Sequence, residues 1–329
     1  MRITRRKLIE LAHREADRRA VEEDILSAYL IGSTVRGEPL FGGTADIDLI
    51  LVHKNPPASK REVIPLSEDV HLDIAHHDRA TYNEPRSLRT SPWLGPALYD
   101  PLFLLDPEHF LEWAQASARS QFNRADYRQA RASGLLAKAR SEVGQLKIPG
   151  AAWPGAYPTA VLDGVNSLAL LVGAPAAGRR LTVTLKQRTE EAGQPEIFET
   201  FLHLIGAAAP DRLDLPGWID AWERAFRAAS SGSSDPRLAP CRMRYYLSGF
   251  EALSEAGWPQ AVVWTLLSTW QIALESLGAG ADGARPEWEA FLHGLNLEEQ
   301  AAEERTGELE AFLDGIEDRI ESWSRAHGA

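Results

Sequence analysis

The spacing of apolar residues changes near Pro107, and this change limits the chain to two parts of different architecture. Before Pro107, short apolar or alternating segments end at Gly, Asn or Pro residues, which is typical of strands. The predicted strands cover 26–31, 46–52, 70–75 and 102–105. After Pro107, apolar residues recur with helical spacing between Gly/Pro/Ser-rich breaks. We therefore expect an α+β fold, with a mixed α/β domain over 1–107 and an all-helical domain over 108–329.

The predicted helices follow from amphipathic spacing and from the breaks that separate them. One helix is expected before the first strand, over 4–23, where Thr4 is a suitable N-cap. The helices of the second domain are predicted over 108–122, 127–146, 159–172, 196–208, 218–229, 238–256, 260–277, 286–295 and 297–327.

Composition and charge exclude several classes of protein. Hydrophobic residues make up 44% of the 329 residues and charged residues 25%, which is typical of a globular protein long enough for two domains. The 47 acidic residues outnumber the 35 basic ones, so nucleic acid is an unexpected partner, because its phosphates require a basic surface. The single Cys241 excludes a disulfide framework and a thiolate zinc cluster and favours a reducing compartment. Because no apolar run reaches the length of a membrane span, we expect a cytoplasmic protein without a membrane partner.

Two carboxylates on one predicted strand form the most informative motif. Asp46 and Asp48 are two residues apart, so they project from the same face of the strand while Ile47 and Leu49 face the core. Adjacent carboxylates repel each other unless a cation binds them, and magnesium is commonly held by a few carboxylates together with substrate phosphates. Upstream, the dipeptide Gly32-Ser33 lies where a strand meets a helix start, and backbone N–H groups at such a turn can bind an anion. A phosphate-binding turn followed by a carboxylate pair predicts phosphoryl-transfer chemistry.

This pattern of residues resembles that of a known superfamily. Gly32-Ser33-x-x-Arg36-Gly37, followed by Asp46-x-Asp48 in an apolar strand, is similar to the nucleotidyltransferases related to DNA polymerase beta. That superfamily has a third carboxylate on a neighbouring strand, and Asp73 fits this position. One difference is Ala45, where the superfamily often has Ser.

The resemblance implies a site and a reaction. Asp46, Asp48 and Asp73 are expected to hold two Mg²⁺ ions, and Gly32 and Ser33 the outer phosphates of a nucleoside triphosphate. Arg36 is expected to neutralise the departing pyrophosphate.

A further resemblance concerns the domain order. An α/β domain followed by a helical domain is similar to the kanamycin nucleotidyltransferases, in which a helical-domain Glu activates the acceptor hydroxyl. Glu142 is expected to take this role here. The implied function is transfer of a nucleoside monophosphate to a small-molecule hydroxyl, with an aminoglycoside, and hence antibiotic resistance, as one possibility that the acidic composition suits. The oligomeric state stays open, with a homodimer as one possibility.

Alternative interpretations exist for both the function and the residues. The chain can instead be an antitoxin-like or regulatory nucleotide-binding protein, or a nucleotidyltransferase that acts on a protein or RNA acceptor. Arg36 can be an ordinary surface arginine and Glu142 a solvated helix residue. Adjacent strand residues face opposite sides, so His76 and His77 are expected to form a polar strand end rather than to share one ion.

Overall fold

The computed structural model describes residues 3–22, 24–38, 40–148 and 153–329. The chain divides into two compact units, the first comprising residues 1–122 and 247–252, the second residues 123–246 and 253–329. All strands of the described residues belong to the first unit, and the described part of the second unit consists of helices and their connections. The predicted α+β class with a helical second part is therefore confirmed.

A mixed sheet of five strands forms the centre of the first unit. The strands are β1 (Ile25–Leu30), β2 (Ala45–His53), β3 (Arg61–Pro65), β4 (Val70–Asp78) and β5 (Leu102–Leu105). Their order in the sheet is β3-β4-β2-β1-β5, with β2 and β4 parallel and every other neighbouring pair antiparallel. The four predicted strands correspond to β1, β2, β4 and β5, whereas the edge strand β3 was not predicted.

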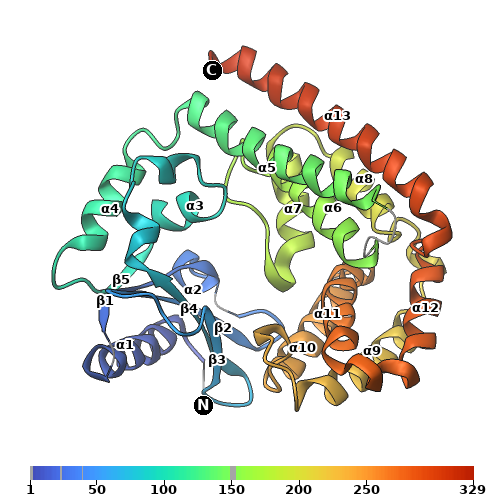
Figure 1. Cartoon of the computed structure of the whole chain (residues 1–329), viewed down its shortest axis with the longest axis horizontal. Coiled ribbons are helices and arrows are strands. Elements are labelled where there is room, and N and C mark those ends of the chain that lie inside the picture. The colour runs from blue at the N-terminus through green and yellow to red at the C-terminus, as the bar shows by residue number, and fades with distance from the viewer. Residues whose placement is uncertain (1–2, 23, 39, 149–152) are drawn as a thin grey trace. The chain divides into compact units, whose positions relative to one another are not determined.

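Helices cover both faces of this sheet (Figure 1). They are α1 (Arg5–Glu22), α2 (Gly32–Arg36), α3 (Leu94–Tyr99) and α4 (Phe110–Arg119). On one face, Leu8 and Ala12 of α1 share a buried cluster with Leu49 of β2. On the other face, Leu98 of α3 and Leu111 of α4 share a second cluster with residues of β1 and β2. The apolar residues of β1 and β2 thus divide between two cores, as strand alternation requires.

The first unit extends beyond the predicted boundary at residue 107. Helix α4 belongs to it because Leu111, Ala114 and Ala118 are fully buried in the same cluster as Tyr29 of the sheet. Burial of this apolar stripe against the sheet explains why a helix that looks like the start of a helical domain packs with the strands.

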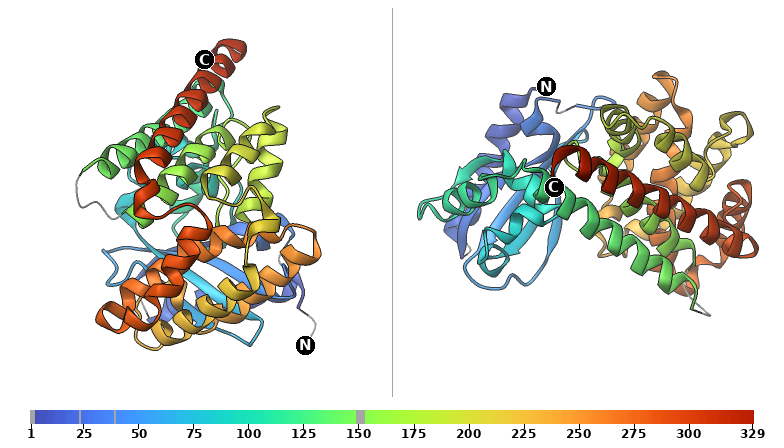
Figure 2. Two further views of the ribbon diagram at one scale, coloured as in Figure 1. Left: turned by 90° about the vertical axis from the view of Figure 1, so that its right-hand side faces the viewer. Right: turned by 90° about the horizontal axis from the view of Figure 1, so that it is seen from above.

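Within the described residues, the second unit contains eight longer helices and both ends of a ninth, α10, whose residues 247–252 belong to the first unit. They are α5 (Ala125–Leu146), α6 (Trp153–Ala169), α7 (Leu181–Glu191), α8 (Glu196–Leu204), α9 (Leu215–Ser230), α10 (Arg242–Glu255), α11 (Val262–Leu277), α12 (Arg285–Gly294) and α13 (Ala302–His327). Figures 1 and 2 show α13 running beside α5, and both pack against α6. Among the described residues, no helix combines the length and the apolar character that crossing a membrane requires.

Two helices of this unit show the largest differences from the prediction. Helix α6 begins at Trp153 rather than at 159, and Pro158 lies inside it. Helix α7 was not predicted, because Thr182, Val183 and Thr184 are β-branched residues with low helix propensity. The segment forms a helix despite this low propensity because Leu181 is buried against the rest of the unit.

Candidate metal centre

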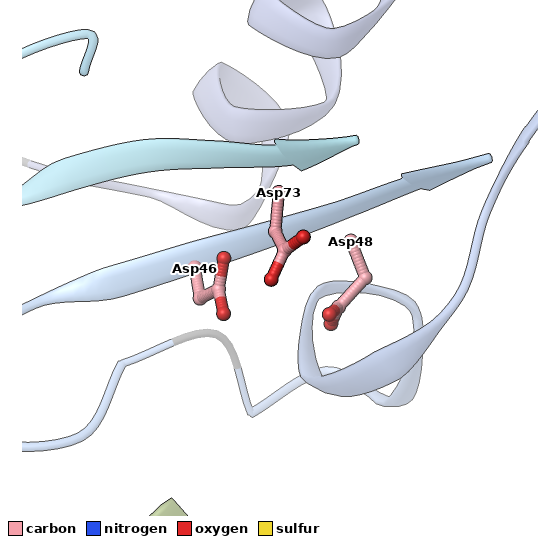
Figure 3. A group of neighbouring side chains, drawn as sticks. All are labelled: Asp46, Asp48 and Asp73. Carbon is pink, nitrogen blue, oxygen red and sulfur yellow. The ribbon is translucent and has the colours of Figure 1, made fainter. Parts of the chain in front are cut away.

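Strands β2 and β4 bring three carboxylates together on one face of the sheet. The parallel register pairs Asp48 of β2 with Asp73 of β4, and Asp46 lies two residues before Asp48 on the same face. Each of the three contributes a carboxylate oxygen, and these oxygens lie within 4.8 Å of one another. Figure 3 shows the three side chains turned toward one another. The convergence of these three predicted residues is therefore present in the structure.

The chemistry of this group suits a divalent cation. Three carboxylates at this separation repel one another, and oxygen atoms are the ligands that Mg²⁺ and Ca²⁺ prefer. Asp73 is buried and the other two are half-buried, which limits screening of their charges by water. The group can therefore hold a metal ion. Among the described residues, no second group of three acidic, histidine or cysteine side chains meets the same distance criterion.

Arginine 61, on the edge strand β3, makes a bidentate ion pair with Asp73. Its Nε donates to Asp73 Oδ1 at 2.5 Å, and its Nη2 donates to Asp73 Oδ2 at 2.6 Å. The Arg61 side chain is 51% exposed, while that of Asp73 is 2% exposed. Arg61 was not predicted as a site residue, because the sequence of β3 does not indicate a strand.

Histidine 71 is a further residue beside the carboxylates. It pairs with Asp46 in the parallel register, and its Nε2 lies 3.2 Å from Asp46 Oδ1. Its side chain is buried. The alternation of β4 contained a signal for this contact, since His71 is two residues before Asp73 and therefore faces the same side.

The Gly32-Ser33 turn lies directly beside Asp48. Helix α2 begins at Gly32, immediately after β1, and the Ile31 N–H donates to the Asp48 carbonyl oxygen at 3.1 Å. Gly32 has a φ of +76°, and a Cβ atom added to it would overlap Asp48 Oδ2. Only glycine therefore allows the turn to approach this carboxylate so closely. Arg36 is the exposed last residue of α2.

Glutamate 142, the predicted acceptor-activating residue, belongs to the second unit. On α5, its Oε1 lies 3.3 Å from Lys138 Nζ, and the same Nζ lies 2.5 Å from Asp163 Oδ2 of α6. Burial raises the pKa of Glu142, and the negative charge of Asp163 raises it further, while Lys138 opposes both effects. The structure thus groups the three aspartates with Gly32, Ser33 and Arg36 in one unit and places Glu142 in the other.

His76 and His77 take part in two separate hydrogen-bond networks. His76 Nδ1 lies 2.8 Å from His53 Nε2, and His76 Nε2 lies 3.0 Å from Glu62 Oε1. His77 Nδ1 lies 2.6 Å from the hydroxyl oxygen of Tyr82. The two residues use different partners, in agreement with the expectation that they do not share one ion.

A scan against protein-family models finds no match, and a search of the curated proteins finds none either. The function is therefore inferred from the motif and from the geometry of the site.

Proposed function

We propose that this protein is a metal-dependent nucleotidyltransferase. It would move a nucleoside monophosphate from a nucleoside triphosphate to a hydroxyl group of a small molecule and release pyrophosphate. The observation that carries the proposal is the convergence of Asp46, Asp48 and Asp73 beside the Gly32-Ser33 turn. Phosphoryl transfer depends on positioning and on charge stabilisation, and a group of carboxylates next to a glycine turn suits both requirements.

The residues of the first unit have distinct proposed roles. Asp46 and Asp48 would hold one Mg²⁺, and Asp73 would take part in holding a second. Bound divalent ions supply charge neutralisation at the phosphates and lower the pKa of a coordinated hydroxyl. The backbone at Gly32-Ser33 would hold the outer phosphates, and Arg36 would neutralise charge on the pyrophosphate.

Glu142 is the residue proposed to act on the acceptor. Glu142 would accept the proton of the acceptor hydroxyl, and its raised pKa makes it a better base near neutral pH than an ordinary carboxylate. The net charge of −12 suits a cationic acceptor such as an aminoglycoside, so a role in antibiotic resistance in the cytoplasm is part of this proposal.

A regulatory nucleotide-binding protein is the second candidate, and one observation favours it. Arg61 engages both oxygens of Asp73, so a protein cation already neutralises the third carboxylate. A chain that binds nucleotide without turnover would have no need to release this arginine. A protein or RNA acceptor is the remaining alternative within the enzyme class, and the acidic composition disfavours RNA.

A labelling experiment separates these candidates. The full chain is incubated with Mg²⁺, each nucleoside triphosphate labelled at the α-phosphate, and a panel of hydroxyl compounds that includes aminoglycosides. We expect a labelled adduct and an equal amount of pyrophosphate, both lost in Asp48→Asn and retained in Asp17→Asn, which alters an exposed carboxylate on α1. Nucleotide binding without pyrophosphate release would favour the regulatory candidate, and a labelled protein would indicate a protein acceptor.

A further inference from the structure

The ion pair between Arg61 and Asp73 occupies the carboxylate that the proposed function assigns to the second metal ion. Both Asp73 oxygens accept a hydrogen bond from the guanidinium, at 2.5 and 2.6 Å. Each oxygen keeps a second lone pair, but the guanidinium places a full positive charge beside the position of an incoming divalent cation. Arg61 and a metal ion at Asp73 therefore compete for the same negative charge.

The two partners of this ion pair differ in their freedom to move. Asp73 belongs to β4, which has β2 and β3 as neighbours on its two sides, and its side chain is 2% exposed. Arg61 is the first residue of the edge strand β3, and its side chain is 51% exposed. The half-exposed guanidinium on the edge strand is therefore easier to displace than the buried carboxylate of the inner strand.

We infer that Arg61 is a positioning residue that makes the two divalent ions bind in a fixed order. This inference rests on the proposed function. The first ion binds at Asp46 and Asp48, and the second binds at Asp73 only as Arg61 withdraws. Without the second ion, Arg61 keeps the buried Asp73 charge neutralised and its side chain oriented toward the other two carboxylates.

A consequence for ligand binding follows from thermodynamic linkage. The planar guanidinium of Arg61 matches the geometry of phosphate or carboxylate groups, so an anionic ligand can take the place of Asp73 as its partner. An anionic ligand that binds the released Arg61 would strengthen binding of the second ion, and the second ion would strengthen binding of that ligand by the same factor. The arginine would in this way couple occupancy of the third carboxylate to the presence of an anionic substrate.

The test counts Mn²⁺ ions on the full chain, without nucleotide, by electron paramagnetic resonance of the free ion. In the wild type we expect one tighter ion and a second, weaker one. In Arg61→Gln the second dissociation constant should fall by about tenfold, because a charge-assisted bidentate contact is removed, while the first changes little. Arg61→Lys, which keeps the charge but loses the fork, should give a smaller change in the same direction.

Two control variants make the result specific. Lys60→Gln removes the same charge from the exposed neighbouring residue, and it should leave both dissociation constants within about twofold of the wild type, because exposed charges are screened. Asp73→Asn should abolish the second ion, and Arg61→Gln should then have no further effect. Circular dichroism of each variant confirms that the sheet is intact.

The outcomes distinguish failure of this inference from failure of the proposed function. Unchanged or weaker binding of the second ion in Arg61→Gln would overturn the role of Arg61, as would an equal gain in Lys60→Gln. A wild type that binds no more Mn²⁺ than Asp48→Asn would overturn the metal site itself, and the inference with it.

Discussion

Strands β2 and β4 carry different residues on their two faces. One face presents Asp46, Asp48 and Asp73, whose oxygens gather within 4.8 Å. The other presents Ile47 and Leu49, which are fully buried in the cluster that includes α1. The same backbone therefore holds a group of mutually repelling carboxylates in place by burying apolar side chains on its reverse side. The proposed activity and the stability can therefore be changed separately by substituting neighbouring residues of one strand.

The largest effect is expected from Asp48→Asn on the carboxylate face. Loss of a ligand charge should lower turnover by about 10³-fold, since metal ions contribute several kcal/mol to transition-state stabilisation. Stability to urea should stay the same or rise by up to about 1 kcal/mol, because one repelling charge is removed. A large loss of stability together with activity would show that the carboxylates serve folding instead.

The second largest effect, a loss of stability, is expected from Leu49→Ala on the buried, apolar face of β2. Removing this fully buried side chain should lower the free energy of unfolding by about 3 kcal/mol in a urea titration. Mn²⁺ binding by the folded fraction should stay within about twofold of the wild type, since no ligand oxygen is altered. Val21→Ala, at an 88% exposed position on α1, is the matched control and should change stability by less than about 0.5 kcal/mol. Loss of metal binding in folded Leu49→Ala protein would contradict the separation of the two faces.

Gly32→Ala should lower both stability and Mn²⁺ affinity, because the backbone of Gly32 lies directly beside the Asp48 carboxylate. A residue with a side chain at φ +76° costs about 1–2 kcal/mol, and its Cβ would displace the Asp48 carboxylate. Gly43→Ala is a matched control, since Gly43 has a φ of +75° and nothing within 4 Å of an added Cβ. We expect similar losses of stability in the two variants, but weakened Mn²⁺ binding only in Gly32→Ala. Equal metal binding in both would show that the turn does not determine the position of Asp48.

The smallest expected effect is a dependence of stability on pH, which comes from His77, a later residue of β4. Burial, and then the charge of His76, lowers the pKa of His77 below its ordinary value of 6.5. The unfolded chain therefore takes up a proton that the folded chain does not, so stability should fall as the pH decreases below about 6.5, by at most about 1.4 kcal/mol per pH unit.

Substitution of His77 tests this dependence. His77→Gln keeps a hydrogen-bonding group near Tyr82 and should flatten the decrease in stability measured by urea unfolding between about pH 6.5 and 5.5. His293→Gln, at a side chain that is 81% exposed, is the control and should leave the slope as in the wild type. An unchanged slope in His77→Gln would contradict the assigned cause.

The site was largely predictable because it depends on strand alternation. Spacing of two residues places Asp46 and Asp48 on one face, and the same rule on β4 selects Asp73. The contact between Arg61 and Asp73 was not predictable in this way. Strand β3 is Arg61–Pro65, with Val63 and Ile64 as its only aliphatic side chains, and its pairing with β4 depends on tertiary contacts.

The fold was predictable at the level of elements and less so at their boundaries. Burial of Leu111 assigns α4 to the sheet unit, a tertiary contact that helical spacing alone does not indicate. Glu142 illustrates a second limit. Its sequence position predicts a helix, which α5 confirms, but its raised pKa comes from burial and from the charge of Asp163 on another helix.

Asp46, Asp48 and Asp73 are proposed to form a divalent-cation site for a nucleoside triphosphate. The most direct measurement is a crystal structure of the full chain with Mn²⁺ and a non-hydrolysable triphosphate analogue, with diffraction recorded at the manganese absorption edge. We expect an anomalous peak from a manganese ion held by Asp46 and Asp48, with the analogue's phosphates beside Gly32-Ser33. Bound analogue without any anomalous peak at these carboxylates would contradict this proposal.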